Sequence, residues 1–332
     1  MQPWDVAWQA ALYGPRGFYR RAVAAQHFRT SVSASPLFAE TVARLARECG
    51  LGAVVDVGSG RGELLQLIAD VDPGLGLVGV DVVPRPPDLP RSARWLESPG
   101  GPSLPALVCS DALVVANEWL DDVPCPVLEV DDAGLLRVVE VAADGTERLG
   151  GAPAAEQLGW AQRWWPAAEP GSRVEVGLPR DRAWAALVAQ APGCVLVAID
   201  YSHLHGARPA AGTLMGYRAG TSVAPVPDGT CDITAHVALD AVAATAGPVT
   251  ASLLTSQRQA LLALGVSGSL PPHSSAARDP AGYLAGLARA ASAAELLEPG
   301  GLGGFGWFVQ SRGPALPAAL AAKSQAVTGK VW

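Results

Sequence analysis

Between residues 52 and 124, short apolar runs typical of strands alternate with stretches that have the apolar spacing of helices or the character of loops. Short β-branched and aliphatic runs at 54–57, 76–83 and 112–116 are separated by stretches with helical or loop character. Strands that alternate with helices pair in parallel, with the helices on the faces of the sheet. Residues 194–201 form a further apolar run, typical of a strand covered on both faces. The pattern predicts an α/β fold on a mostly parallel sheet.

The flanking segments predict additional parts. Residues 1–48 have helical spacing, with Pro36 suited to a first helical turn, and predict a helical N-terminal cap. Runs at 127–130 and 135–141 around a polar turn predict a β-hairpin. Four further elements are expected: helices at 156–165 and 180–190, a strand at 173–176 and a helix at 234–246. Towards the C-terminus, a helical pair at 281–294 should precede a closing strand at 305–309.

These elements predict a division of the chain into a core with additions. The expected parts are a cap at 1–48, a core at 49–124 and 194–312, an inserted hairpin and helix subdomain at 125–193, and a flexible tail at 313–332. The tail is expected to be flexible because it is low in complexity and terminal.

A glycine-rich turn follows the first strand of the core. It contains Gly58, Gly60 and Gly62 and leads into a helical pattern. Glycine removes side chains where a backbone must approach a ligand, and the start of a helix has free N–H groups. A dinucleotide-binding turn needs its third glycine where this chain has Glu63. The spacing therefore argues against a dinucleotide. A turn that binds nothing is the alternative.

Residues 56–62 read Asp-x-Gly-x-Gly-x-Gly, which resembles the first motif of the class I S-adenosylmethionine methyltransferases. On this resemblance Asp56 suits the amine at the methionine end of the cofactor, and the turn residues Gly58, Ser59, Gly60 and Gly62 contact it. Asp81 ends the next strand, roughly twenty residues past the glycines, where doubly wound folds place an acid that binds ribose hydroxyls. An aspartate that merely opens a loop is the alternative.

Composition narrows the class of protein. The chain has 332 residues, 49% hydrophobic and 17% charged, which describes a globular protein with an ample core. A net charge of −7 argues against a broad nucleic-acid or membrane surface. The five cysteines include no Cys-x-x-Cys pair and predict reduced thiols. With no signal pattern and no apolar run of about 18 residues, we expect a cytoplasmic protein.

Several blocks together resemble the MidA family, the bacterial relatives of the mitochondrial complex I assembly methyltransferase. They are residues 12–19, 28–31, 35–40, 117–124, 212–217 and 232–237, and the resemblance covers most of residues 10–310. It implies a Rossmann-like class I methyltransferase sheet with an antiparallel closing strand, and S-adenosyl-L-methionine as the cofactor. It also implies cofactor contacts from Thr30, Ser31 and Asn117.

The family resemblance also bears on the methyl acceptor. The mitochondrial member methylates a protein arginine, so a protein side chain is implied here. Two places depart from the family pattern: Gln26-His27 replace its Gly-Asp, and Trp119, Leu120 and Asp122 replace two phenylalanines and an alanine beside the expected acceptor pocket.

Methyl transfer from a sulfonium needs positioning and exclusion of water more than acid–base groups. Glu118 and Asp121 follow a strand end, so both are expected at the transfer site, where they could hold a guanidinium or orient an amine. For Asp121 and Asp122, a place in the first turn of a short helix is the alternative. His236 could be a general base for a hydroxyl acceptor or could hold a core helix, and both roles stay open.

No metal is expected. His203, His205 and His236 could share a zinc ion, but no cysteine lies near them in the sequence, and a loop with one structural histidine explains them equally well.

Three functions remain open from the sequence. The first is methylation of a protein side chain, with arginine as the acceptor. The second is N- or O-methylation of a small metabolite, and the third is a cofactor-binding assembly factor without turnover. The expected partner is the methyl acceptor, with a homodimer as a candidate assembly.

Overall fold

The computed structural model describes residues 1–21, 31–107, 109–245 and 247–322. The described residues form a seven-stranded central sheet, which in spatial order contains β16 (Ala251–Ser256), β17 (Gly306–Ser311), β10 (Val195–Asp200), β5 (Ala112–Asn117), β2 (Ala53–Val57), β3 (Gly76–Asp81) and β4 (Arg94–Glu97). Neighbouring strands from β10 to β4 pair in parallel. Strand β17 is antiparallel to both of its neighbours, β10 and β16. The sheet is therefore mostly parallel, as the sequence predicts.

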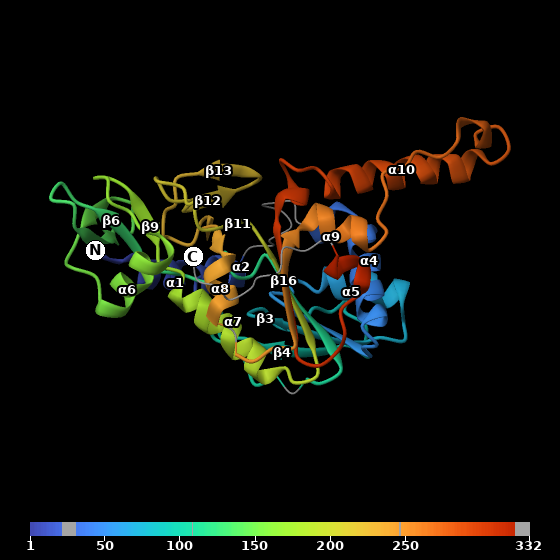
Figure 1. The fold of residues 1–332 in the computed structure, drawn as a ribbon, viewed down its shortest axis with the longest axis horizontal. Coiled ribbons are helices and arrows are strands. Elements are labelled where there is room, and N and C mark those ends of the chain that lie inside the picture. The colour runs from blue at the N-terminus through green and yellow to red at the C-terminus, as the bar shows by residue number, and fades with distance from the viewer. Residues whose placement is uncertain (22–30, 108, 246, 323–332) are drawn as a thin grey trace.

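Helices cover both faces of the central sheet (Figure 1). One face carries α4 (Pro36–Glu48), α5 (Glu63–Val71) and α9 (Gln257–Ala263), and the other carries α7 (Leu178–Gln190) and α8 (Leu239–Thr245). Successive strand residues point to opposite faces, so Val54 and Leu113 join the first core and Val55 and Val114 join the second. This two-sided burial explains why the strands are apolar throughout.

A second, smaller sheet lies beside the central one (Figure 1). It contains β1 (Gln2–Pro3), β7 (Leu136–Val141), β6 (Val127–Val130) and β9 (Arg173–Glu175), with β8 (Glu147–Leu149) paired to β7. Strands β6 and β7 are antiparallel neighbours, which confirms the predicted hairpin. Helices α1 (Trp4–Tyr13) and α6 (Ala155–Trp164) pack against this part through the buried residues Trp4, Trp8 and Trp160.

Further strands and helices lie outside these two sheets and the helices that cover them. Strands β13 (Thr221–Val223), β12 (Met215–Arg218) and β14 (Asp232–Thr234) form one small sheet, and β11 (Ser202–His203) pairs with β15 (Val237–Ala238). The remaining helices are α2 (Phe18–Arg21), α3 (Ser31–Ala34), α10 (Pro280–Leu296), α11 (Ala318–Ala321) and the 3-10 turns η2 (His273–Ser275) and η3 (Leu302–Gly304). Helix α10 projects away from the body (Figure 1). None of the described helices is long and apolar enough to cross a membrane.

Two element predictions are wrong. The helix expected over 234–246 begins only at Leu239, because residues 232–234 pair with β12 and residues 237–238 pair with β11. Tertiary strand pairing here overrides the local apolar spacing. The helical pair expected at 281–294 is a single helix, α10. The division of the chain into cap, core, insertion and tail stays a prediction, and residues 323–332 of the tail lie outside the described residues.

Candidate functional site

A pocket of about 190 Å³ opens at the carboxyl edge of the parallel strands. The ends of β2, β3, β5 and β10 form one part of its lining, and residues of α1, α2, β12 and β14 form another. The carboxyl ends of parallel strands are where open α/β sheets bind ligands. The described part of the chain thus has a pocket at the edge that the sequence predicts.

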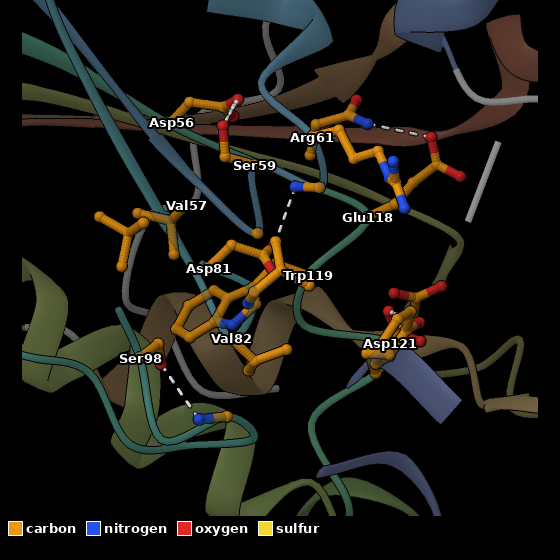
Figure 2. Close-up of a pocket in the computed structure, with 18 of the residues that line it drawn as sticks. Asp56, Val57, Ser59, Arg61, Asp81, Val82, Ser98, Glu118, Trp119 and Asp121 are labelled. Carbon is orange, nitrogen blue, oxygen red and sulfur yellow. Dashed lines mark hydrogen bonds between the residues drawn. The ribbon is translucent and has the colours of Figure 1, made fainter. Parts of the chain in front are cut away.

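The glycine-rich turn forms one wall of this pocket. Gly58 and Gly60 line it with φ of 75° and 57°, a conformation that side chains disfavour. The Gly60 N–H donates to Asp81 Oδ2 at 2.8 Å, and the Ser59 hydroxyl donates to Asp56 Oδ2 at 2.7 Å (Figure 2). Asp81 therefore joins the end of β3 to the turn after β2.

Burial changes the protonation of both acids. It raises the pKa of Asp56 to about 7, against a hydrogen bond from Ser59 that lowers it. It raises the pKa of Asp81 to about 6, although the backbone N–H groups of Gly60 and Val83 stabilise its charged form. A ligand that presents cationic or hydrogen-bond donor groups here would favour the ionised acids.

Gly62 has a different surrounding from the other two glycines. Its φ is 76°, and a Cβ atom at this position would lie 2.7 Å from Leu89 Cδ1. It precedes α5 and is not among the residues that line the pocket. The structure therefore gives Gly62 a packing role under Leu89.

Glu118 lines the same pocket, immediately after β5. It has a φ of 51°, unusual for a residue with a side chain, and its N–H donates to the carbonyl of Ile199 at 2.8 Å. Its carboxyl accepts a hydrogen bond from Asn117 Nδ2 at 3.0 Å and another from the backbone of Ser31. Burial and then the charge of Asp121 raise the pKa of Glu118 to about 8. The strained backbone thus holds in the pocket lining a carboxyl that ionises only above neutral pH.

Asp121 lies on the same wall as Glu118 (Figure 2) and is almost completely buried. Burial raises its pKa to about 6, while the charge of Arg180 and a hydrogen bond with Asp200 oppose the rise. Asp200, at the end of β10, accepts the N–H of Leu120 at 3.0 Å. The pKa of Asp200 is raised first by burial and then by the charge of Asp121, which favours its protonated form.

Arg180 of α7 fixes the backbone around this wall. Its side chain is 1% exposed. Its guanidinium donates to the carbonyls of Asp121 at 2.7 Å, His236 at 2.9 Å and Val123 at 3.0 Å. One buried side chain thus joins the loop after β5 to the segment between β14 and β15.

His236 and Ser31, two further predicted site residues, do not line the pocket. The ring of His236 stacks on Tyr201 at 5.4 Å, and it is Tyr201 that lines the pocket. Burial and then the charge of Arg180 lower the pKa of His236, which favours the neutral ring. Ser31 donates its hydroxyl to Gln257 at 3.1 Å and reaches the site only through Glu118. Thr30 lies outside the described residues.

The three candidate zinc histidines have other surroundings. Arg208 contacts His203 through the ring nitrogen Nδ1, and burial lowers the pKa of His203 to about 3. His205 is exposed. Among the described residues, no group of three or more histidine, cysteine or acidic side chains could hold a metal ion.

Several pocket residues were not predicted as site residues. They are Tyr13 and Tyr19 from the N-terminal helices, and Tyr201, Tyr217, Asp122 and Asp232 from the later chain. Tyr13, Tyr19 and Asp232 belong to the blocks that resemble the MidA family. Those blocks were the available signal, but no local pattern indicates that they meet.

The whole fold is similar to two crystal structures from Burkholderia thailandensis. One is described as a superfamily member and likely methyl transferase, and it is bound to S-adenosyl-homocysteine. It is 23% identical to this chain with a TM-score of 0.79, and the match covers 97% of this chain and 91% of that one. The other is a native structure of an uncharacterized protein of the same superfamily, with 24% identity, a TM-score of 0.78 and the same coverage. No curated protein matches the chain. At these identities the similarity shows the fold.

The family follows from the sequence itself. Residues 82–254, about half of the chain, match the model of a family described as "Putative S-adenosyl-L-methionine-dependent methyltransferase". The chain belongs to this family. It is a methyltransferase whose cofactor is S-adenosyl-L-methionine.

Proposed function

We propose that this methyltransferase acts on a side chain of a protein, with an arginine nitrogen as the acceptor, as in the MidA family. One observation carries the proposal: four acids gather in the lining of the pocket, which we call its acidic wall. Glu118, Asp121, Asp122 and Asp232 all line the pocket. Among the described residues, none of these four carboxylates forms a salt bridge. A guanidinium carries five donors that suit several carboxylates at once.

The wall that the glycine-rich turn forms supports the placing of the cofactor. Bound S-adenosyl-L-methionine supplies an electrophilic methyl group. We propose that Gly58, Ser59 and Gly60 contact it through their backbone, that Asp81 binds its ribose hydroxyls and that Asp56 lies near its amine. Asn117 fits the same wall, because its Oδ1 is buried in the lining without a hydrogen-bond donor. The Rossmann-like class I arrangement and the division into core and insertion belong to the same proposal.

The acidic wall has a second task in this proposal, which is to orient the acceptor. Glu118 and Asp121 would hold the guanidinium so that one nitrogen faces the methyl group, an alignment that contributes much of the rate in group transfer. His236 would act behind the pocket by supporting Tyr201. A small basic metabolite is the second candidate, because the same carboxylates would bind its cation.

A labelling experiment tests the acceptor. The enzyme, S-adenosyl-L-methionine with a tritiated methyl group, and a bacterial lysate are incubated together, and the product is separated by size and then hydrolysed. Label in methylated arginine of the protein fraction supports the proposal. Label in small molecules would show that the methyl acceptor is a metabolite. Label on another amino acid would overturn arginine as the acceptor.

Asp81→Ala tests the cofactor wall separately. A carboxylate bonded to ribose hydroxyls contributes on the order of 1.5–3 kcal/mol, so affinity for S-adenosyl-homocysteine should fall roughly ten- to hundredfold. Calorimetric titration measures it, and Asp132→Asn in the exposed β6–β7 turn is the control. An unchanged dissociation constant would show that Asp81 only begins the loop after β3 and does not bind the cofactor.

A further inference from the structure

Tyr19 connects two carboxyls of the pocket that are far apart in the sequence. Its hydroxyl lies 2.8 Å from Asp232 Oδ1 and also makes a hydrogen bond with Asp122 Oδ2. The three residues come from α2, from the loop after β5 and from β14, and all three line the pocket. Tyr13 braces the same loop by donating its hydroxyl to the carbonyl of Asp122 at 3.1 Å.

Counting hydrogens shows what this arrangement needs. A tyrosine hydroxyl has one hydrogen, and ionised carboxylates have none. Tyr19 can donate to only one of its two partners, so the other contact is a hydrogen bond only when that carboxyl is itself protonated. Asp122, Asp232 and Tyr19 therefore hold one proton beyond that of the hydroxyl. The same conclusion follows from electrostatics, because two like charges this close to one hydroxyl would repel each other.

Among the residues that the structure describes, the groups around this trio are negative or neutral on almost every side. The titratable groups facing the trio are Tyr13 of α1, Asp81 of β3, Glu118 and Asp121 after β5, Asp200 of β10, Tyr217 of β12 and Arg180 of α7. Arg180 is the cation among them, and it is bonded to three backbone carbonyls. Burial raises the pKa of Asp232 to about 7 and also raises that of Asp122, whose Oδ1 is buried without a donor.

A cation that enters this pocket would change the balance. It would supply donors to Asp122 Oδ1 and the positive charge that the two carboxyls otherwise obtain from a proton. With the cation present both carboxyls can ionise, and Tyr19 needs to donate to only one of them. A neutral ligand offers no charge in exchange and leaves the proton in place.

We propose that Tyr19, Asp122 and Asp232 select a cationic methyl acceptor, and that its charge replaces the proton which the two carboxyls share around Tyr19. This inference deepens the proposed function and rests on it, because it assumes that the acceptor binds at the acidic wall. Tyr19 is a positioning residue in this account. The exchange conserves charge: one cation enters the pocket and one proton leaves to solvent.

Calorimetry with a matched pair of probes tests the exchange. N-acetyl-L-arginine amide and its neutral counterpart N-acetyl-L-citrulline amide are titrated into the protein with S-adenosyl-homocysteine present, near pH 7. Each titration is run in two buffers of different ionisation enthalpy, so that the difference in heat counts the protons released. We expect about one proton released per bound arginine probe, and at least tenfold weaker binding of the citrulline probe with no release.

Variants locate the proton. Asp232→Asn removes one titrating group of the trio and should lower the release, and Tyr19→Phe should weaken the arginine probe about tenfold and reduce the release. Tyr283→Phe, on the projecting helix α10, is the control and should behave as the wild type. Circular dichroism establishes that each variant is folded. Asp122→Asn provides a second readout if Asp232→Asn fails to fold.

Three results would overturn the inference: binding of the arginine probe without proton release, equal binding of the two probes, or no binding of the arginine probe at all. Its failure is distinguishable from failure of the proposed function. Label on protein arginine in the lysate experiment would leave the acceptor standing even when the calorimetry shows no proton exchange.

Discussion

At the scale of single residues, the pocket depends on backbone conformations that few side chains tolerate. Gly60 and Glu118 both have positive φ and line the pocket. Gly60 needs this conformation because its N–H must reach Asp81, and Glu118 adopts it although its side chain is penalised there. The strain at Glu118 is held by the bond from its N–H to Ile199. Each residue therefore permits a specific test.

Gly60→Val should abolish measurable binding of S-adenosyl-homocysteine. A β-branched side chain resists a φ of 57°, and its Cβ would lie 3.3 Å from Glu63 Oε2 and withdraw the N–H from Asp81. Calorimetric titration measures the binding. Gly134→Val is the matched control, because Gly134 has a φ of 77° in a hairpin turn with no atom within 4 Å. It should lose stability and keep its affinity, and equal loss of binding in both variants would contradict the prediction.

Glu118→Gln should lower the rate of methyl transfer at least tenfold and leave S-adenosyl-homocysteine affinity within a few-fold. A bound cation favours the ionised form of Glu118, whereas the amide keeps the shape but cannot ionise to hold a cationic acceptor during transfer. Asp121→Asn should have a smaller effect, since its backbone is held by Arg180. Single-turnover rates are compared with melting temperatures. Full activity with a lowered melting temperature would remove Glu118 from the catalytic residues.

At the scale of secondary-structure elements, helix α7 holds the acidic wall from behind. Arg180 and Arg182 lie two residues apart on it and have opposite environments. Arg180 is buried over the ring of Trp8 and bonds three carbonyls, whereas Arg182 is exposed and pairs with Glu156 at 2.8 Å. Comparing Arg180 with Arg182 therefore distinguishes the effect of a buried cation that positions the backbone from that of an exposed cation in the same helix.

Arg180→Met should destabilise the protein by roughly 3–5 kcal/mol, because three buried carbonyls lose their donor. Arg182→Met should change the stability by less than about 1 kcal/mol, as is usual for an exposed ion pair. Chemical denaturation of both variants measures the difference. Similar losses for the two would show that the three carbonyl bonds of Arg180 contribute little.

At the scale of the whole molecule, the carboxyls make stability depend on pH. Burial raises the pKa to about 7 for Asp56 and Asp232, to about 8 for Glu118 and to about 6 for Asp121. In the unfolded chain such groups titrate near their ordinary values of about 4. Between about pH 4 and pH 8 the folded protein thus binds more protons than the unfolded one, and its free energy of unfolding falls as the pH rises.

The ligand-free protein should therefore have a higher melting temperature at pH 5 than at pH 8. Thermal unfolding at constant ionic strength across this range measures it. Glu118→Gln should flatten the upper part of the curve, near pH 7 to 8, because it removes a group that titrates in this range. A melting temperature that rises steadily from pH 5 to pH 8 would contradict the raised pKa values.

The sequence predicted what depends on local pattern and did not predict what depends on distant contact. The glycine-rich turn and Asp81 were found because a strand, a turn and an acid follow one another within about thirty residues. Tyr19 and Asp232 have no such signal, since they meet across 213 positions. The helix expected over 234–246 was wrong for the same reason, because strand partners elsewhere in the chain decide the structure there.

The same separation has a consequence for synthesis on the ribosome. The wall around the glycine-rich turn is encoded within a short stretch early in the chain, whereas the trio of Tyr19, Asp122 and Asp232 needs a segment that emerges more than two hundred residues after its first member. Long-range contacts of this kind close late in folding, because the loop entropy must be overcome first. A nascent chain would thus present an incomplete acidic wall until most of the protein has left the exit tunnel.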